Sequence, residues 1–171
     1  MDVEKYKKEF ENLRPNRTST HTRPHKACML LAVIDLIERG VISKNEIHFS
    51  VELRDAFSER FAVYKQGNDK DDPAQPFFYL SSSPFWRLVP AAGKESELKH
   101  RLDKRQHGST KQVDELIGFA MLEPELFQVF QNDVYRAMLS EVLEAELISN
   151  EEAFKRWSHG IGKSDKTISN Y

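Results

Sequence analysis

The chain has 171 residues, of which 39% are hydrophobic and 30% are charged, and its formal net charge is −2. These values are typical of a soluble globular protein with one buried core. The longest apolar run, Ala27 to Ile34, is too short to cross a bilayer, and the charged N-terminus lacks the apolar stretch of a signal peptide. The single cysteine, Cys28, excludes a disulfide framework within the chain, and we therefore expect a cytoplasmic protein.

The charges are distributed unevenly along the sequence. Residues 12–34 contain no acidic side chain, although basic residues and histidines are frequent there. A second basic cluster lies in residues 99–111, whereas residues 112–153 are strongly acidic. This asymmetry indicates one surface suited to a polyanion and another kept away from it. Two solvated surfaces of opposite sign would give the same pattern, so charge alone leaves both readings open.

The first third of the chain predicts two helices and a connecting loop. Residues 3–13 carry apolar side chains at three- and four-residue spacing, which is the pattern of a short amphipathic helix. Residues 16–22 are polar and predict a loop. Pro24 stands where a proline is tolerated, in the first turn of a largely apolar helix that runs to about Arg39. Gly40 is a natural helix stop.

The next segment predicts a short strand, a helix and a hairpin. Residues 46–49 have an extended pattern, and Ser50 is the expected N-cap of a helix that ends near Tyr64. After a polar loop, two aromatic and aliphatic runs, residues 77–80 and 85–89, flank a serine-rich turn. Such a pair favours a β-hairpin. Helix, short strand, helix and hairpin is the order of a winged-helix unit.

The rest of the chain predicts further helices. Their expected bounds are Ser96–Leu102, Val113–Leu122, Pro124–Phe130 and Asp133–Ile148. The predicted fold class is therefore α+β and mostly helical, with a winged-helix-like core, a β-hairpin and additional C-terminal helices. We expect one domain over residues 1–158 and a flexible tail over residues 159–171.

The sequence makes a poor case for catalysis. His21 and His25 are four residues apart, but His21 precedes the predicted helix and no nearby side chain completes a metal shell. The acidic stretch 69–72 resembles a nuclease metal site in composition, yet it lies in a loop without flanking strand patterns. None of the common catalytic motifs occurs. We therefore expect no metal, no cofactor and no catalytic residues.

Two stretches resemble a known family. Residues 23–26 (RPHK), which lead into the apolar run 27–32, look like the opening of the sulfur-binding domain of phosphorothioate-dependent, HNH-containing type IV restriction endonucleases. Residues 76–80 and 85–88 are similar to the hairpin of the same family, in the same order and at similar spacing. The resemblance covers about residues 1–148. It implies a module that binds double-stranded DNA carrying phosphorothioate, with any nuclease activity in a separate HNH domain or partner.

In that family, discrimination depends on a small apolar pocket. Sulfur is larger, more polarizable and more weakly hydrated than oxygen, so an apolar pocket accepts it at lower desolvation cost. The resemblance implies that a proline ring and a small side chain one turn later form the pocket, and Pro24 and Ala27 match this pair. Arg23 replaces an aromatic residue of some family members, so His21 or the Arg23 stem is expected to form that wall, with His25 beside them.

The DNA-binding surface is expected to surround this pocket. Basic and hydroxyl side chains near the predicted helix start and hairpin turn would contact phosphates, and residues 104–109 combine side chains that can address base edges. The predicted DNA-binding residues are Arg14, Arg17, Thr22, Lys26, Ser82, Ser83, Lys104, Arg105, Gln106, His107, Gly108 and Ser109.

Other interpretations stay open at this point. Pro24 and Ala27 also fit an ordinary helix start with close packing, and residues 104–109 also fit a plain surface loop. The chain could be a general winged-helix DNA-binding domain without preference for sulfur. A nuclease with an atypical site and a protein-interaction module that uses the acidic helices after Gln112 are the remaining alternatives.

Overall fold

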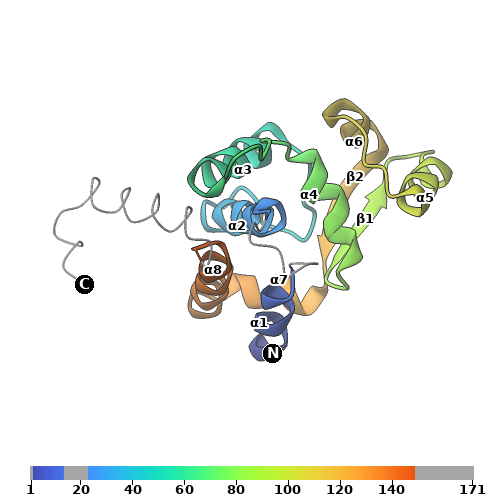
Figure 1. Cartoon of the computed structure of the whole chain (residues 1–171). Helices are drawn as coiled ribbons and strands as arrows, with labels where there is room; N and C mark the ends of the chain where they lie inside the picture. Colours follow the sequence, from blue (N-terminus) through green and yellow to red (C-terminus); the bar gives the residue numbers. More distant parts are fainter. Residues whose placement is uncertain (1, 14–22, 149–171) are drawn as a thin grey trace.

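The computed structural model describes residues 2–13 and 23–148 and shows a helical body beside one small sheet (Figure 1). The elements in chain order are α1 (Val3–Glu11), α2 (His25–Glu38), α3 (Val51–Tyr64), α4 (Ala74–Tyr79), the 3₁₀ turn η1 (Leu80–Ser82), β1 (Trp86–Pro90), α5 (Glu95–Lys104), α6 (Thr110–Leu116), β2 (Ile117–Leu122), α7 (Pro124–Gln131) and α8 (Asp133–Ile148). The predicted mostly helical α+β class is confirmed. The winged-helix-like core and the domain boundary at residue 158 stay predictions.

Some predictions concern residues outside the described part of the chain. The loop expected over residues 16–22 and the tail expected over residues 159–171 both lie there. Within the described residues, no helix has both the length and the apolar character needed to cross a membrane.

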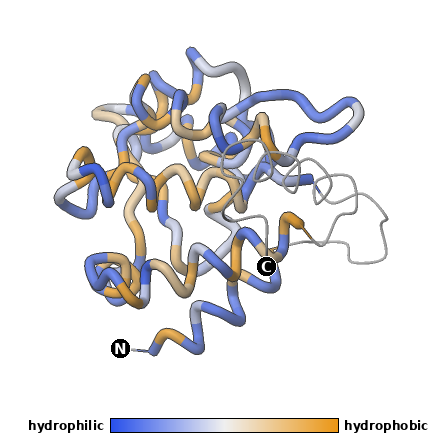
Figure 2. Tube along the Cα trace, turned by 90° about the vertical axis from the view of Figure 1, so that its left-hand side faces the viewer, coloured by the Kyte–Doolittle hydropathy of each residue, from blue (hydrophilic) through white to orange (hydrophobic). Residues whose placement is uncertain are grey.

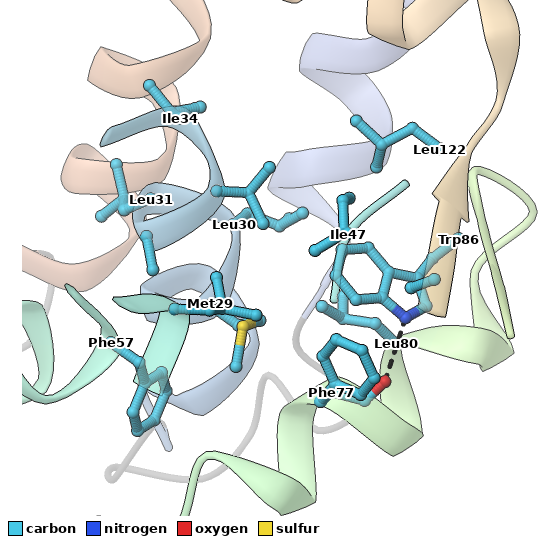
Figure 3. Close-up of a cluster of buried hydrophobic side chains, with 14 of the residues drawn as sticks. Met29, Leu30, Leu31, Ile34, Ile47, Phe57, Phe77, Leu80, Trp86 and Leu122 are labelled. Carbon is cyan, nitrogen blue, oxygen red and sulfur yellow. Dashed lines mark hydrogen bonds between the residues drawn. The ribbon is translucent and has the colours of Figure 1, made fainter. Parts of the chain in front are cut away.

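Helix α2 forms the centre of the core. Nearly all of its side chains are buried, and the helix contacts α3, α4, α7 and α8. Figure 3 shows Leu30 of α2 directed toward Ile47 and Trp86, with Phe77 of α4 beside the indole. The Trp86 Nε1–H donates a hydrogen bond of 3.0 Å to the carbonyl oxygen of Phe77, which satisfies both buried polar groups. In Figure 2, hydrophilic residues follow the outer turns, and hydrophobic residues concentrate where the elements pack.

Most helix predictions are confirmed to within a few residues. Ser50 caps α3 as expected, because its hydroxyl accepts a hydrogen bond of 3.1 Å from the Leu53 backbone N–H. Helix α3 ends at Tyr64, and α2 is followed by Gly40, whose φ of 77° lies in the left-handed region. These ends agree with the sequence because local chemistry determines them.

The sheet has two antiparallel strands, β1 and β2, that are separated in sequence by α5 and α6. Trp86 pairs with Leu122, and Leu88 pairs with Ala120. The expected extended segment 46–49 contributes one bridge, in which the backbones of Ile47 and Ala120 exchange two hydrogen bonds of 2.8 Å. Residues distant in sequence therefore meet at Ala120.

The predicted position of the hairpin is wrong. The run 77–80 belongs to α4 and η1, and only the second run, 85–89, forms a strand. Short apolar runs do not distinguish a buried helix from a buried strand. The start of α4 is fixed by Pro73, which its N-cap position tolerates, and by an Asp72 carboxylate oxygen that accepts from the Ala74 backbone N–H at 3.2 Å.

The helix predicted over Val113–Leu122 is correct only for its first part. Helix α6 ends at Leu116, and the chain continues directly as β2. β1 offers an antiparallel partner for this segment. A tertiary pairing therefore overrides the local helical pattern.

Candidate functional site

The N-terminal turn of α2 carries the sulfur-pocket residues predicted from the sequence. Pro24 is the N-cap residue, and its carbonyl oxygen accepts from the Cys28 backbone N–H at 2.9 Å. Pro24 is buried, Ala27 is 9% exposed, and Arg23 is exposed. The Pro24–Ala27 pair therefore lies mostly under the surface.

His25 lies inside the protein, with 5% of its surface exposed. Its ring packs against Phe61 at 4.8 Å and Phe57 at 6.3 Å, measured between ring centroids. Its Nε2 lies 2.8 Å from the carbonyl oxygen of Lys70, so this nitrogen carries the proton and donates. His25 thus joins α2 to α3 and to the loop before α4, and a contact of this ring with DNA stays a prediction.

An open cleft of about 380 Å³ lies between α1, the start of α2 and the segment that joins η1 to β1. We call it the α1–α2 cleft. Its lining residues are Lys8, Glu9, Asn12, Leu13, Lys26, Ser82, Ser83, Pro84 and Phe85. It therefore brings together three of the predicted DNA-binding residues from two distant parts of the sequence: Lys26, Ser82 and Ser83.

Lys26 is the cation on the α2 side of this cleft. Its Nζ donates to the Ser82 hydroxyl at 3.3 Å, and that hydroxyl donates to the carbonyl oxygen of Tyr79 at 3.0 Å. Burial lowers the pKa of Lys26, because a partly desolvated ammonium is less favourable than a solvated one. An anion that enters the cleft would compensate this charge.

Two other lining residues of the cleft provide an apolar ring and a carboxyl group. Pro84 is exposed, in contrast to Pro24, so its ring faces the open space that the cleft provides. Glu9 lies on the α1 side. Burial raises the pKa of the Glu9 carboxyl, and its Oε2 atom is buried without a hydrogen-bond partner among the described residues.

The second predicted DNA-binding region, residues 104–109, forms the connection between α5 and α6. Lys104, Arg105 and Gln106 are exposed. Arg105 adopts the left-handed conformation (φ 54°) as the C-cap of α5, and Gly108 has a φ of 82°. Ser109 caps α6 in a capping box with the glutamine three residues later. Both ends of this loop are therefore fixed, while its first three side chains extend into solvent.

A hydrogen-bond network fixes the middle of the same loop. The Tyr79 hydroxyl donates to the carbonyl oxygen of Arg105 at 2.8 Å. His107 Nδ1 lies 3.3 Å from this hydroxyl, and His107 Nε2 lies 3.3 Å from a carboxylate oxygen of Asp72. The rings of Tyr79 and His107 meet edge to face, with centroids 5.3 Å apart. We call Tyr79, His107 and Asp72 the loop clamp.

Tyr79 connects the two predicted DNA-binding regions. Its hydroxyl holds the loop at Arg105, and its carbonyl oxygen accepts from Ser82, which lines the α1–α2 cleft. The structure does not place Pro24 or Ala27 among the lining residues of that cleft. The predicted residues Arg14, Arg17, His21 and Thr22 lie outside the described part of the chain.

Sequence reasoning missed several residues of this site. The sequence predicts Glu9 only as part of an amphipathic helix and Pro84 only as part of a turn. Asp72 falls in a predicted acidic loop, and Tyr79 in the first run of the predicted hairpin. A proline after three serines, next to a buried aromatic run, was the available signal for Pro84. The contacts of Tyr79 and Asp72 depend on tertiary structure and left no local signal.

The described residues contain no group of three or more histidine, cysteine, aspartate or glutamate side chains placed to hold a metal ion. Cys28 is buried, and burial raises the pKa of its thiol, which keeps it in the unreactive protonated form. In the acidic stretch 69–72, Asp72 faces His107, and Asp69 accepts from the Gln66 backbone N–H at 3.0 Å. These carboxylates thus take part in loop structure.

Comparison with known proteins identifies the family. No curated protein matches the chain. The family model described as "ScoMcrA-like, DNA sulfur-binding domain" matches residues 3–148, which includes every element of the fold from α1 to α8. The match also includes both the α1–α2 cleft and the loop clamp. The chain therefore belongs to the ScoMcrA-like DNA sulfur-binding domain family.

Proposed function

We propose that this domain recognises phosphorothioate-modified double-stranded DNA in a way that depends on the bases around the modification, and that it does so without catalytic residues of its own. The family membership supports the ligand class. The observation that carries the proposal is the α1–α2 cleft, where the cation of Lys26 and the exposed ring of Pro84 border the same space. Any cleavage would come from a separate HNH domain or a partner.

The chemistry of the modified phosphate fits this combination. A phosphorothioate is an anion, so it needs a positive partner, and its sulfur is weakly hydrated and polarizable, so it gains from contact with an apolar ring. Lys26 supplies the charge and Pro84 the apolar surface. An ordinary phosphate oxygen placed against the proline ring would lose hydrogen bonds to water, which favours the sulfur compound.

The pocket predicted from Pro24 and Ala27 remains part of the proposal as a second candidate contact for the sulfur, in the same helix turn as Lys26. The helix N-terminus there presents backbone N–H groups that favour an anion. Residues 14–22 connect the cleft residue Leu13 to Arg23. We therefore propose that Arg14, Arg17, His21 and Thr22 contact the modified phosphate or its neighbours.

Base recognition is assigned to the loop between α5 and α6. Arg105 and Gln106 are exposed, and arginine and glutamine form paired hydrogen bonds with the edges of guanine and adenine. Lys104 is suited to a phosphate contact. The rest of the loop supports these side chains. His107 belongs to the loop clamp, Gly108 forms the turn, and Ser109 caps α6.

The test is binding to two duplexes that are identical except for one phosphorothioate linkage, at ~150 mM salt, where non-specific phosphate contacts are weak. We expect a clear preference for the sulfur duplex. Equal binding in several sequence contexts would indicate instead a general DNA-binding domain, and no binding to either duplex would refute a role in DNA recognition.

Variants separate charge from sulfur contact. Lys26→Gln should weaken binding to both duplexes, whereas Pro84→Ser should reduce only the preference for sulfur. Pro124→Ser is the matched control, since Pro124 is also exposed and lies at the start of α7. Ala27→Ser tests the neighbouring pocket. If Ala27→Ser removes the preference and Pro84→Ser does not, sulfur lies against Ala27 and not against Pro84.

A further inference from the structure

Arg105 occupies a backbone conformation that its own residue type does not favour. It is the only non-glycine residue with positive φ among residues 2–13 and 23–148. For a residue with a Cβ, this conformation is less favourable than the right-handed helical one, so neighbouring contacts must stabilise it. Part of this stabilisation is the helix C-cap, in which the Arg105 backbone N–H donates to Leu102 at 3.2 Å and that of Gln106 to Arg101 at 3.1 Å.

The carbonyl group of Arg105 is held from outside the loop. The Tyr79 hydroxyl donates to it across 26 positions of sequence. The hydroxyl proton is therefore donated to the Arg105 carbonyl oxygen. In the contact between the histidine and the tyrosine, His107 Nδ1–H is then the donor and the hydroxyl oxygen is the acceptor. The imidazolium form of His107 would also donate from Nε2 to the Asp72 carboxylate. The loop is therefore tied to α4 and to the segment that begins it.

The clamp side chains are placed for support rather than for contact with DNA. Tyr79, His107 and Asp72 are only partly exposed, and their polar atoms face one another. Arg105 and Gln106, in contrast, are exposed. His107, which the sequence suggested as a base-reading residue, is thus better placed to position its two neighbours.

We infer that the loop clamp is a specificity device: Tyr79, His107 and Asp72 are positioning residues that set how Arg105 and Gln106 meet the base edges. The inference rests on the proposed function and deepens it. Paired hydrogen bonds to a base edge require correct backbone placement, so loosening the loop costs base discrimination. Sulfur preference depends on the α1–α2 cleft and should persist.

The experiment uses a pool of duplexes that carry one phosphorothioate linkage with randomised flanking bases, together with the same duplexes without sulfur. The wild-type chain first defines the preferred flanking bases and the ratio of its dissociation constants for preferred and unpreferred flanks. Tyr79→Phe then removes one hydroxyl and retains the ring. We expect the flank ratio to shrink about threefold to tenfold, the range of one hydrogen bond, and the sulfur ratio to stay within about twofold.

Two further variants separate positioning from general damage. Asp72→Asn keeps an oxygen acceptor for the Ala74 backbone N–H and can present its amide N–H to His107 Nε2, so it should retain the flank ratio, whereas His107→Ala should lose it. Tyr135→Phe is the control, because it removes a hydroxyl from α8, which packs on α1, α2 and α7.

The possible outcomes distinguish failure of the loop-clamp inference from failure of the proposed sulfur recognition. An unchanged flank ratio in Tyr79→Phe overturns the clamp, and so does a wild-type chain that prefers sulfur but no particular flank. Loss of both ratios together shows that Tyr79 supports the whole surface, which also overturns it. A wild-type chain without any sulfur preference refutes the proposed function instead.

Discussion

Glu9 provides a sharp test of the α1–α2 cleft as an anion site, because it places a carboxyl group on the wall of that cleft. If a phosphorothioate enters, the ionised Glu9 repels it, so Glu9→Gln should bind modified DNA more tightly than the wild-type chain. An anion at the centre of a cleft of about 380 Å³ lies roughly 6 Å from a lining carboxylate, where two like charges repel by about 0.7 kcal/mol in a water-like medium. A less polar surrounding increases this value, so we expect an affinity gain of about threefold or more.

The same argument fixes the direction of the pH dependence. Burial raises the pKa of Glu9, and a bound anion raises it further, so the complex holds more protons than the free protein. Wild-type affinity should therefore rise as the pH falls from about 7 toward 5, and the affinity of Glu9→Gln should rise less. The lysines on the cleft, Lys8 and Lys26, are present in both proteins, so the difference between the two profiles isolates Glu9.

The assay is a fluorescence anisotropy titration of one sulfur-containing duplex, carried out at several pH values and at low and moderate salt. Salt should reduce the difference between the two proteins, because it screens the repulsion. Equal or weaker binding by Glu9→Gln at every pH would refute the location of the modified phosphate in this cleft. The sulfur preference itself could then still reside at Ala27.

Three further predictions concern stability and are measured by urea unfolding. Trp86→Phe leaves the buried carbonyl of Phe77 without its donor and should cost about 1–3 kcal/mol. Ser50→Ala removes the cap of α3 and should cost about 1 kcal/mol. Hydrogen bonds from Tyr6 and Lys5 lower the pKa of Glu123, so their stabilisation is present above the ordinary glutamate pKa and is lost as the pH falls through the lowered one. Tyr6→Phe should thus be more strongly destabilised at pH ~7 than once Glu123 is protonated; an equal loss at both pH values would contradict this.

The parts of the fold that the sequence predicted are those with a local cause. The apolar composition of α2 and the hydroxyl of Ser50 act within their own segments, so they identify a core helix and a helix start without tertiary information. The sequence predicts the run 77–80 incorrectly because a short apolar run fits a buried helix as well as a buried strand. It predicts the segment 117–122 incorrectly because that structure depends on a partner far away in sequence. β2 forms a strand because β1 pairs with it. In that pairing Pro90, the last residue of β1, lies opposite Ile117, which is 27 positions later in the sequence.

The candidate site shows the same division. Lys26, Ser82 and Ser83 were predicted as DNA contacts from the motif and the turn, and they do line one cleft. Burial could not be predicted in this way. Pro24 matches a helix-start pattern and is buried, whereas Pro84 belongs to a plain turn and is exposed on the cleft. Which of two prolines faces solvent depends on the elements packed over it, and no local motif encodes that.

The connection through Tyr79 has a consequence for how such a domain would read DNA. Its carbonyl oxygen is hydrogen-bonded to Ser82 at the cleft, and its hydroxyl to Arg105 in the loop, so one residue ties the proposed sulfur site to the proposed base-reading site. Because Phe77, Phe78 and Leu80 beside it are buried, we expect this connection to be rigid. The loop should then meet bases at a fixed offset from the modified phosphate. A preferred sequence would be lost when it is moved by a single base pair, although the sulfur and the bases are all still present.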